Sequence, residues 1–384
     1  MSGIYLDYQS ASPVDPRVRE FAERYLANEF GNPSALHSNG LAAKTVIEEA
    51  RFKVAELINA ETPETIIFAS SATEANNLAI HGFVRRNASK GKALLASAIE
   101  HISVLNPLKD LKKGGFDLAL IPVDSEGVID LAALERMLSK ETILTSVMYA
   151  NSEIGTIEPI REISETVHEK GLYLHVDAAA AEGRVPLDVQ TEGIDLLTLS
   201  SNDLYGPQGA GALYIKPGMR IQPVLFGGGQ EKGFRPGTEN LFAIVGMGEA
   251  ARLAKLEMDE EGSRLRSIRD ELIKEILKID EAYLTGHPTK RLPNHASFRF
   301  SRIEGESILL TMDAMFNIQV STGSACSSRT LEPSHVLLAI GLKHEQAHGS
   351  MVMTLGKYNY PEQIPVISNA VNNTVQRLRA LSPL

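Results

Sequence analysis

Residues 65–84 read TIIFASSATEANNLAIHGFV, and this stretch decides the fold. The first five residues are apolar or β-branched, which predicts a short buried strand. Ser70, Ser71 and Ala72 form a turn of small residues, and residues 73–84 have the pattern of a helix. A strand that passes at once into a helix is half of a βαβ unit. The sequence therefore predicts an α/β protein with a mostly parallel sheet.

The same alternation extends in both directions from this stretch. Further buried strands are expected at 143–149, 172–176 and 196–199, and a helix at 42–59. After the turn at Gly227 to Gly229 the composition changes, and residues from about 250 to 280 predict a long charged helix, followed by a strand at 296–300 and a C-terminal helix. We expect a large α/β domain over residues 15–245. A smaller α/β domain is expected over residues 246–384, with residues 1–14 packed against it.

Composition excludes several classes of protein. The 384 residues include 48 Asp and Glu against 38 Lys and Arg, a formal charge of -10, which argues against nucleic acid or an anionic membrane as a general partner. No apolar run approaches the ~18 residues of a membrane span, and no signal peptide is apparent. The single cysteine excludes an intrachain disulfide. We expect a cytoplasmic protein.

Three segments carry candidate chemistry. The turn and helix start in SSATEANN would present free N–H groups and the Thr73 hydroxyl to a phosphate, although a plain capped helix fits as well. Asp177 ends a predicted strand, where a carboxylate points into the ligand crevice of a parallel sheet or caps a helix. His101, in AIEHISV, is either structural or catalytic.

The only cysteine, Cys326, lies in VSTGSACSSRTLEPS, a small and polar stretch without helical or strand period. We expect an exposed flexible loop there. A free cysteine in such a loop is a candidate nucleophile or metal ligand, whereas most free cysteines are buried and inert.

Together these segments resemble the cysteine desulfurases of the IscS/NifS type, in the class V aminotransferase group of pyridoxal-phosphate (PLP) enzymes. The resemblance covers essentially the whole chain. Its motifs are YLDYQSASPVDPRV at 5–18, GNPSALHSNG at 31–40, FASSATEANNLAI at 68–80, EHISV at 100–104, NSEIGTIEPI at 151–160, HVDAA at 175–179, YGPQGAGALY at 205–214, GGGQEKGFRPGTEN at 227–240, STGSACSS at 321–328 and SHVLLAIGL at 334–342.

The resemblance implies the PLP-dependent transferase fold type I, with a seven-stranded-type sheet in the large domain, and a homodimer. It also implies site roles. Ala72, Thr73 and Ser200 would hold the PLP phosphate, with Thr238 contributed by a second subunit. His101 would stack on the ring, Ser152 would lie beside the ring hydroxyl and Asp177 would pair with the ring nitrogen. Cys326 would accept the substrate sulfur.

The chain departs from the family where the cofactor is bound covalently. The family's lysine precedes Tyr-Gly-Pro, in a Ser-x-His-Lys motif, but here the stretch reads SSNDLYGP. Asp203 stands at the lysine position and Asn202 at the histidine. A carboxylate can neither form an imine with PLP nor act as the amine base that moves the Cα proton.

Other departures fall around the same site. Ser152 replaces an asparagine and Ala180 a glutamine, both beside the ring hydroxyl. Val352 replaces the arginine that clamps the substrate carboxylate, and Lys357 replaces the last arginine of that motif. Ser71 and Pro236 alter the phosphate loops. The chain resembles the archaeal branch that lacks the PLP lysine.

The first hypothesis is therefore an IscS-like protein of iron–sulfur cluster assembly that has lost the family's desulfuration. It would dock an IscU-type scaffold and offer Cys326 as sulfur acceptor or as the fourth ligand of a [2Fe-2S] cluster, beside three scaffold cysteines. PLP would be absent or held without a covalent bond. Asp203 could also be an oxygen ligand for iron, but the sequence shows no pair of histidines that would complete such a site.

Three alternatives stay open at this point. The chain is an active PLP-dependent cysteine desulfurase if another amine, such as Lys232, replaces the lysine. It runs a different lysine-less PLP reaction if His101 serves as the base. It is a structural or regulatory partner if the site is empty and Cys326 is dispensable.

Overall fold

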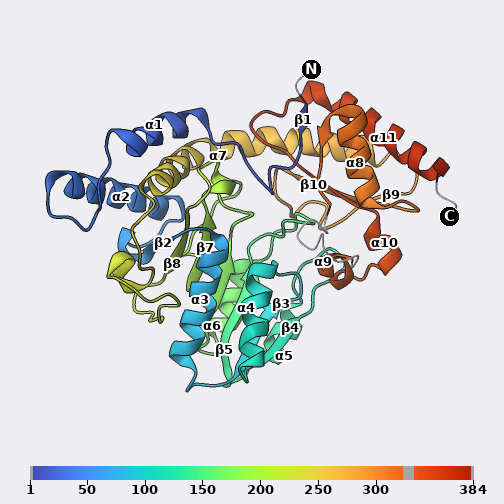
Figure 1. Ribbon diagram of the computed structural model, residues 1–384. Coiled ribbons are helices and arrows are strands. Elements are labelled where there is room, and N and C mark those ends of the chain that lie inside the picture. The colour runs from blue at the N-terminus through green and yellow to red at the C-terminus, as the bar shows by residue number, and fades with distance from the viewer. Residues whose placement is uncertain (1–2, 323–332, 382–384) are drawn as a thin grey trace.

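A seven-stranded sheet forms the centre of the molecule (Figure 1). The computed structural model describes residues 3–322 and 333–381. The sheet has the order β2-β8-β7-β6-β5-β3-β4, in which only β8 (Gly211–Ile215) runs antiparallel to its neighbours. The expected α/β fold with a mostly parallel sheet is confirmed. The other strands are β2 (Ile66–Ala69), β3 (Ala93–Ser97), β4 (Asp117–Ile121), β5 (Thr142–Met148), β6 (Leu174–Asp177) and β7 (Leu196–Ser200).

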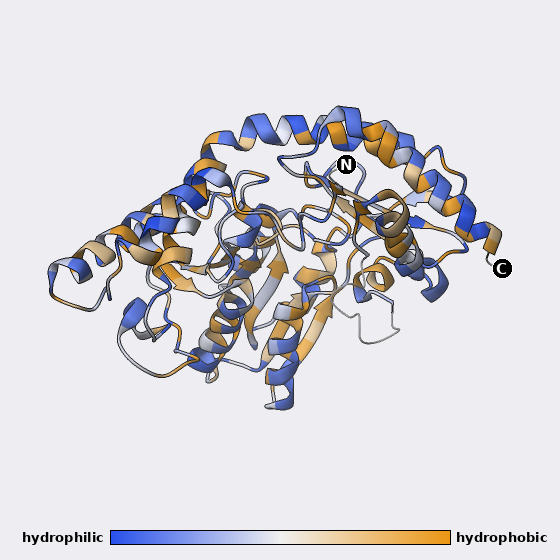
Figure 2. Cartoon of the chain, turned by 45° about the horizontal axis from the view of Figure 1, so that its top comes forward, coloured by the Kyte–Doolittle hydropathy of each residue, from blue (hydrophilic) through white to orange (hydrophobic). Residues whose placement is uncertain are grey.

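Helices cover both faces of this sheet, and an apolar core lies on each side. Buried strands such as β5 and β7 have no exposed residue, as expected for parallel strands covered on both faces. Figure 2 shows these strands as hydrophobic ribbons between helices with hydrophilic outer turns. The helices of this part are α1 (Pro16–Ala27), α2 (Ser38–Leu57), α3 (Ala72–Asn87), α4 (Ile102–Lys113), α5 (Leu131–Met137) and α6 (Ile160–His168).

A second core lies in the C-terminal part and includes Leu6 from the N-terminal segment. Its sheet has the order β12-β10-β9, and β1 pairs with β11 beside it. The elements are β1 (Ile4–Tyr5), β9 (Ala282–Leu284), β10 (His295–Phe300), β11 (Ile318–Gln319), β12 (Ser350–Thr354), α8 (Gly305–Phe316), α9 (His335–Ala339), α10 (His344–His348) and α11 (Ile364–Leu381).

Helix α7 (Leu241–Ile276) joins the two parts. Its first half, through Leu253, packs in the core of the large sheet, and its second half, from Leu265, packs in the C-terminal core. The sequence placed this helix at about 250–280 because its charged residues begin there, whereas its first turns are apolar and buried. The expected boundary between residues 245 and 246 falls inside this continuous helix.

The strand and turn at residues 65–72 form largely as expected. Thr65 ends a short 3-10 helix, β2 begins at Ile66, and α3 begins at Ala72 with Ser71 as its N-cap. The Ser71 hydroxyl accepts a hydrogen bond from the Glu74 N–H at 3.2 Å.

β2 is an edge strand, and two side chains cover its open edge. Arg51 Nη1 donates to the Ile66 carbonyl at 2.8 Å, and a Glu231 oxygen accepts from the Phe68 N–H at 2.7 Å. Arg51 and Glu231 also pair with each other at 2.7 Å. Both side chains are buried, so this ion pair takes the place of a neighbouring strand.

Candidate functional site

A cavity of about 480 Å³ opens at the carboxyl ends of the parallel strands. This is the edge where ligands bind in open α/β sheets, and the volume suits a small organic ligand. Seven of the residues expected at the site line it: Ala72, Thr73, His101, Ser152, Asp177, Ser200 and Asp203. The structure thus brings together residues that are far apart in the sequence.

The structure does not place the other two expected site residues, Thr238 and Cys326, in this cavity's described lining. Thr238 lies in the loop before α7 and does not line this cavity, and its role towards a second subunit stays a prediction. Cys326 lies outside the described residues, so its expected loop and its role stay predictions. The flanking residues Ser321 and Thr322 do line the cavity.

A polar chain fixes the back wall of the cavity. Asp177, at the end of β6, accepts from Asn76 Nδ2 at 2.7 Å and from the Ala179 N–H at 3.1 Å. Asn76 Nδ2 also donates to the Ser103 hydroxyl at 2.9 Å, and that hydroxyl lies 2.8 Å from His101 Nδ1. His101 Nδ1 accepts from the Ser103 N–H, which leaves the hydroxyl as the donor to the ring. The chain therefore holds Asp177 and His101 in fixed orientations.

Sequence reasoning missed Asn76 and Ser103. Asn76 is fully buried, and it stands on the inner face of α3 at a position that the helical pattern leaves to apolar residues. The signal available was its place in TEANN, directly after the predicted phosphate turn. Ser103 follows His101 by two residues, a spacing typical of a helix N-terminus.

Asp203 lies in a 3-10 turn (Asn202–Leu204) directly after β7. Gln9 Nε2 donates to its Oδ1 at 3.2 Å. The nearby Arg184 guanidinium contacts the Asp203 carbonyl, at 3.5 Å, and stacks on the Tyr205 ring. Burial raises the pKa of Asp203 to about 7, while the positive charge of Arg184 opposes the shift. The carboxyl is therefore near its midpoint at neutral pH.

A second buried carboxyl lies behind Asp203. Glu182 is fully buried, accepts from the Ser200 N–H, and has no hydrogen-bond partner at Oε2 in the described structure. Burial, with the negative charge of Asp203 as a further cause, raises its pKa well above the usual range. This side of the site therefore holds two carboxyl groups that favour their protonated forms, at the place where the family has an amine.

The lining does not fit a covalently held PLP. Four acidic residues line the cavity (Asp7, Glu153, Asp177 and Asp203), and within residues 3–322 and 333–381 no lysine or arginine does. The start of α3 offers hydroxyl and N–H donors to a phosphate, but no described amine lies in the lining to hold the cofactor covalently. Val352, on β12, is 5 % exposed and gives a carboxylate ligand no partner. The half of the site around Asp177 and His101 keeps the polar groups expected for a pyridine ring.

The candidate replacement amine lies elsewhere in the chain. Lys232 Nζ donates to the Glu64 carbonyl at 2.7 Å and lines a different cavity, between the 33–36 segment and the 229–232 turn. Lys357 lines a small second cavity together with Asp203, but its Nζ pairs with Asp15 at 2.6 Å and with Glu257 at 3.0 Å. Within one chain, neither amine is placed to replace the family's lysine.

No group of three or more metal-ligating side chains occurs in the part of the chain that the structure describes. Asp203 thus has no companions there for an iron site. The same part contains no helix that is long and apolar enough to cross a membrane.

Comparison with known proteins agrees with the fold and the motifs. The family model "Aminotransferase class-V" matches residues 4–366. "Cysteine desulfurase IscS 1" of Archaeoglobus fulgidus is 54% identical over 380 residues, 99% of each chain, and "Cysteine desulfurase IscS" of Dictyoglomus turgidum is 47% identical over 99% of this chain and 96% of its own. A solved "NIFS-LIKE PROTEIN" superposes with a TM-score of 0.92 at 31% identity, over 98% of this chain and 100% of that one. The chain therefore belongs to the class V aminotransferases, in the cysteine desulfurase family of the IscS/NifS type.

Proposed function

We propose that the chain is an IscS-like protein of iron–sulfur cluster assembly in which PLP-dependent desulfuration of cysteine is lost. It acts as a homodimer, docks an IscU-type scaffold and offers Cys326 as sulfur acceptor or as a ligand of a [2Fe-2S] cluster. Family membership supports the place in iron–sulfur assembly. One observation carries the loss: the carboxyl group of Asp203 stands where the family has its lysine, and among the described residues no lysine or arginine lines this cavity.

Three arguments of charge and bonding support this reading. A carboxyl group cannot form an imine, so the cofactor has no covalent anchor at position 203. The acidic lining disfavours a substrate carboxylate, for which Val352 offers no partner. A thiolate at Cys326 needs none of the lost residues to coordinate iron, because three scaffold cysteines and one partner thiolate complete a four-sulfur set.

The first experiment asks whether the purified protein binds PLP and releases sulfide. Protein with saturating PLP and cysteine is assayed for an absorption band that shifts on borohydride reduction and then stays with the unfolded protein, for sulfide and for alanine. We expect neither a reducible adduct nor sulfide. Sulfide release with a reducible adduct would establish the alternative, an active cysteine desulfurase that uses another amine such as the partner subunit's Lys232. Sulfide-free turnover with PLP would instead favour the lysine-less reaction with His101 as base.

The second experiment tests Cys326 with a scaffold protein under anaerobic conditions. Cys326→Ala and Cys326→Ser are compared with the wild type for scaffold binding and for the lifetime of a reconstituted [2Fe-2S] cluster. We expect unchanged binding and a cluster lifetime shortened at least tenfold in both variants, because neither supplies a thiolate. A cluster as stable with Cys326→Ala as with the wild type would remove the proposed role and leave a structural partner.

A further inference from the structure

Helix α9 packs onto the large domain through a small apolar cluster of its own. Ile99, Met148 and Ile154 come from the large domain, and Val336, Leu337, Ile340 and Ala347 come from α9 and α10. All seven side chains are nearly or fully buried. This cluster is separate from the main cores, so the contacts of α9 with the large domain do not depend on either of them.

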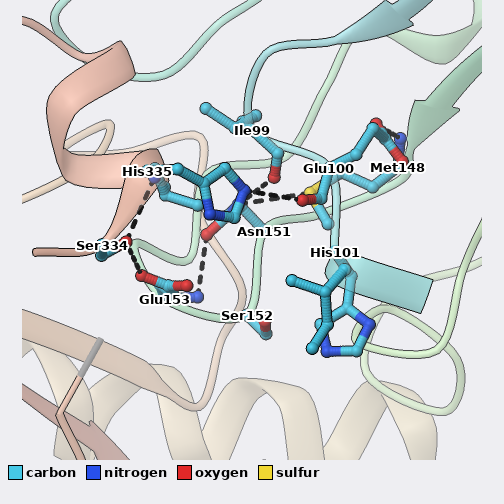
Figure 3. Close-up of a pocket in the computed structure, with 11 residues that line it drawn as sticks. Ile99, Glu100, His101, Met148, Asn151, Ser152, Glu153, Ser334 and His335 are labelled. Carbon is cyan, nitrogen blue, oxygen red and sulfur yellow. Dashed lines mark hydrogen bonds between the residues drawn. The ribbon is translucent and has the colours of Figure 1, made fainter. Parts of the chain in front are cut away.

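Two polar contacts close the same interface (Figure 3). The Ser334 hydroxyl, at the N-cap of α9, donates to Glu153 and accepts from the Val336 N–H at 3.1 Å. His335 Nε2 donates to the Glu100 carbonyl at 2.9 Å. Glu153 and Glu100 belong to the large domain, so both contacts exist only while α9 is docked.

Two carboxyl groups lie beside the docked α9, and of these Glu153 is half-buried and also lines the large cavity. Glu100 is fully buried, with Oε1 accepting from the Met148 N–H at 2.6 Å and with no described partner at Oε2. Between Glu100 and Glu153 lies a cavity of about 30 Å³, room for about one water molecule, that no described lysine or arginine lines. Taking carboxylates out of water without a cation favours their neutral forms.

We propose that α9 is a proton-linked latch, whose docking on the large domain is favoured by protonation of Glu153 and loosened when Glu153 ionises. The inference goes beyond the proposed function, since it needs neither PLP, nor a scaffold, nor Cys326.

The sign of the linkage follows from the direction of the shift. Burial raises the pKa of Glu153 to about 7 from its usual 4.5, and the hydrogen bond from Ser334 only partly offsets the shift. The docked state therefore holds a proton that the open state releases between pH 4.5 and 7. Docking is strongest at the acid end of this window and weakens as pH rises through it.

Other charged groups face the interface and shape its pH dependence. Burial raises the pKa of Glu100 well above its usual range, and the negative charges of Asp177 and Glu158 add to this shift. Burial lowers the pKa of His335, and the nearby Lys109 and His101 lower it further. His335 therefore opposes docking on acidification below about pH 6.5, the reverse of Glu153. A variant that removes only the Glu153 titration separates the two.

Hydrogen exchange of α9 amides measures the latch directly. The Leu338 and Ile340 N–H groups donate within α9 and its C-cap, to Ser334 and Val336, so their exchange reports its opening. Rates are divided by those of the unfolded peptide at each pH, and amides of α11 serve as an internal reference. Glu153→Gln keeps an acceptor for Ser334 but does not titrate, and His335 contributes equally to both proteins.

The opening constant of the wild type, relative to Glu153→Gln, is expected to rise up to about tenfold between pH 6 and pH 8. Glu135→Gln, at an exposed carboxylate on α5, is expected to behave as the wild type. A ratio that stays constant across this range overturns the latch.

A reciprocal measurement keeps the test independent of how Glu153→Gln folds. Leu337→Ala weakens the apolar contact of α9, and carboxyl carbon NMR follows the titration of Glu153 in that variant. Because linkage is reciprocal, a looser α9 is expected to move the pKa of Glu153 down towards its usual value. An unchanged titration midpoint in a variant whose α9 amides exchange faster would overturn the proposal.

Discussion

The side-chain amide of Gln9 donates to Oδ1 of Asp203 at 3.2 Å and so joins the N-terminal segment to the turn where the family has its lysine. Neutral amide donors stabilise a carboxyl group without requiring that it be charged. The contact is compatible with a carboxyl group that titrates near neutral pH, as Asp203 does. The raised pKa of Asp203 predicts how the free energy of unfolding depends on pH.

Asp203→Asn is expected to make the protein more stable than the wild type at pH 8. Folding raises the pKa of Asp203 from its usual 3.8 to about 7, so wild-type stability falls as pH rises from about 4 to 7. The variant does not lose stability in this way, so its free energy of unfolding at pH 8 is expected to exceed that of the wild type by ~1–3 kcal/mol. This difference shrinks towards pH 5. Urea unfolding of both proteins at pH 5 and at pH 8 measures this difference. Asp259→Asn, at an exposed position on α7, is the control, and its stability relative to the wild type should not change between pH 5 and pH 8.

Asp203→Lys is expected to bind PLP in a form that borohydride traps, yet to release no sulfide from cysteine. The new amine faces the cavity, but Val352 still leaves the substrate carboxylate without a partner. Absorbance after reduction and a sulfide assay in the same sample separate binding from turnover. Sulfide release by this single variant would mean that the carboxylate is held by a group other than the one at position 352.

Lys357→Met is expected to lower the free energy of unfolding by ~1–3 kcal/mol at pH 7. Lys357 Nζ lies 2.6 Å from Asp15, which is 4 % exposed and keeps only Arg17 as a cation when Lys357 is removed. Lys278→Met removes the lysine of an exposed pair with Glu275 and serves as the control. It should lower the free energy of unfolding only slightly.

The same contacts predict an acid response. Hydrogen bonds from Arg17, with those from Lys357 adding to them, hold the pKa of Asp15 far below its usual range. This stabilisation is present above about pH 4 and is lost as pH falls further. The difference in the free energy of unfolding between the wild type and Asp15→Asn is therefore expected to shrink steadily as pH falls from about 4 to 2. A constant difference at every pH would show that Asp15 acts only through packing.

Arg51→Met is expected to destabilise the protein by ~3–5 kcal/mol, because Glu231 would remain buried without a cation. The turn at Glu231 also depends on this pair, since Glu231 and Lys232 both have positive φ, 47° and 58°, which L-residues adopt at a cost. Arg161→Met, in the exposed pair with Glu165, is the matched control and should cost under ~0.5 kcal/mol. Chemical denaturation of both variants checks this prediction.

Local patterns were enough to predict much of the sheet and part of the site. The sequence predicted β2, β5, β6 and β7 but not β3, β4 and β8, and the residues that follow the parallel strands lie at one edge of the sheet by topology. Asp177 could therefore be placed from the local pattern, whereas Asp203 was identified only through the resemblance to the family's lysine motif. The resemblance to the family placed His101, Ser152 and the phosphate turn.

Contacts between distant segments could not be predicted in the same way. Gln9 and Asp203 are separated by 194 positions, and nothing local to either residue indicates the other. Asn76 is polar on an otherwise apolar helix face and is explained only by Ser103 and Asp177, from two other elements. The start of α7 was missed for the opposite reason, because its first turns are buried and lack the charged pattern of its second half.

The ion pair along β2 has a consequence for how the molecule behaves in a crowded solution. An edge strand with open N–H and C=O groups is a template on which another chain can add a strand, and repeated additions build insoluble aggregates. At β2 the Ile66 carbonyl and the Phe68 N–H are already bonded to Arg51 and Glu231. An incoming strand would have to displace a buried salt bridge before it formed its first hydrogen bond, so the pair protects this edge of the sheet from aggregation.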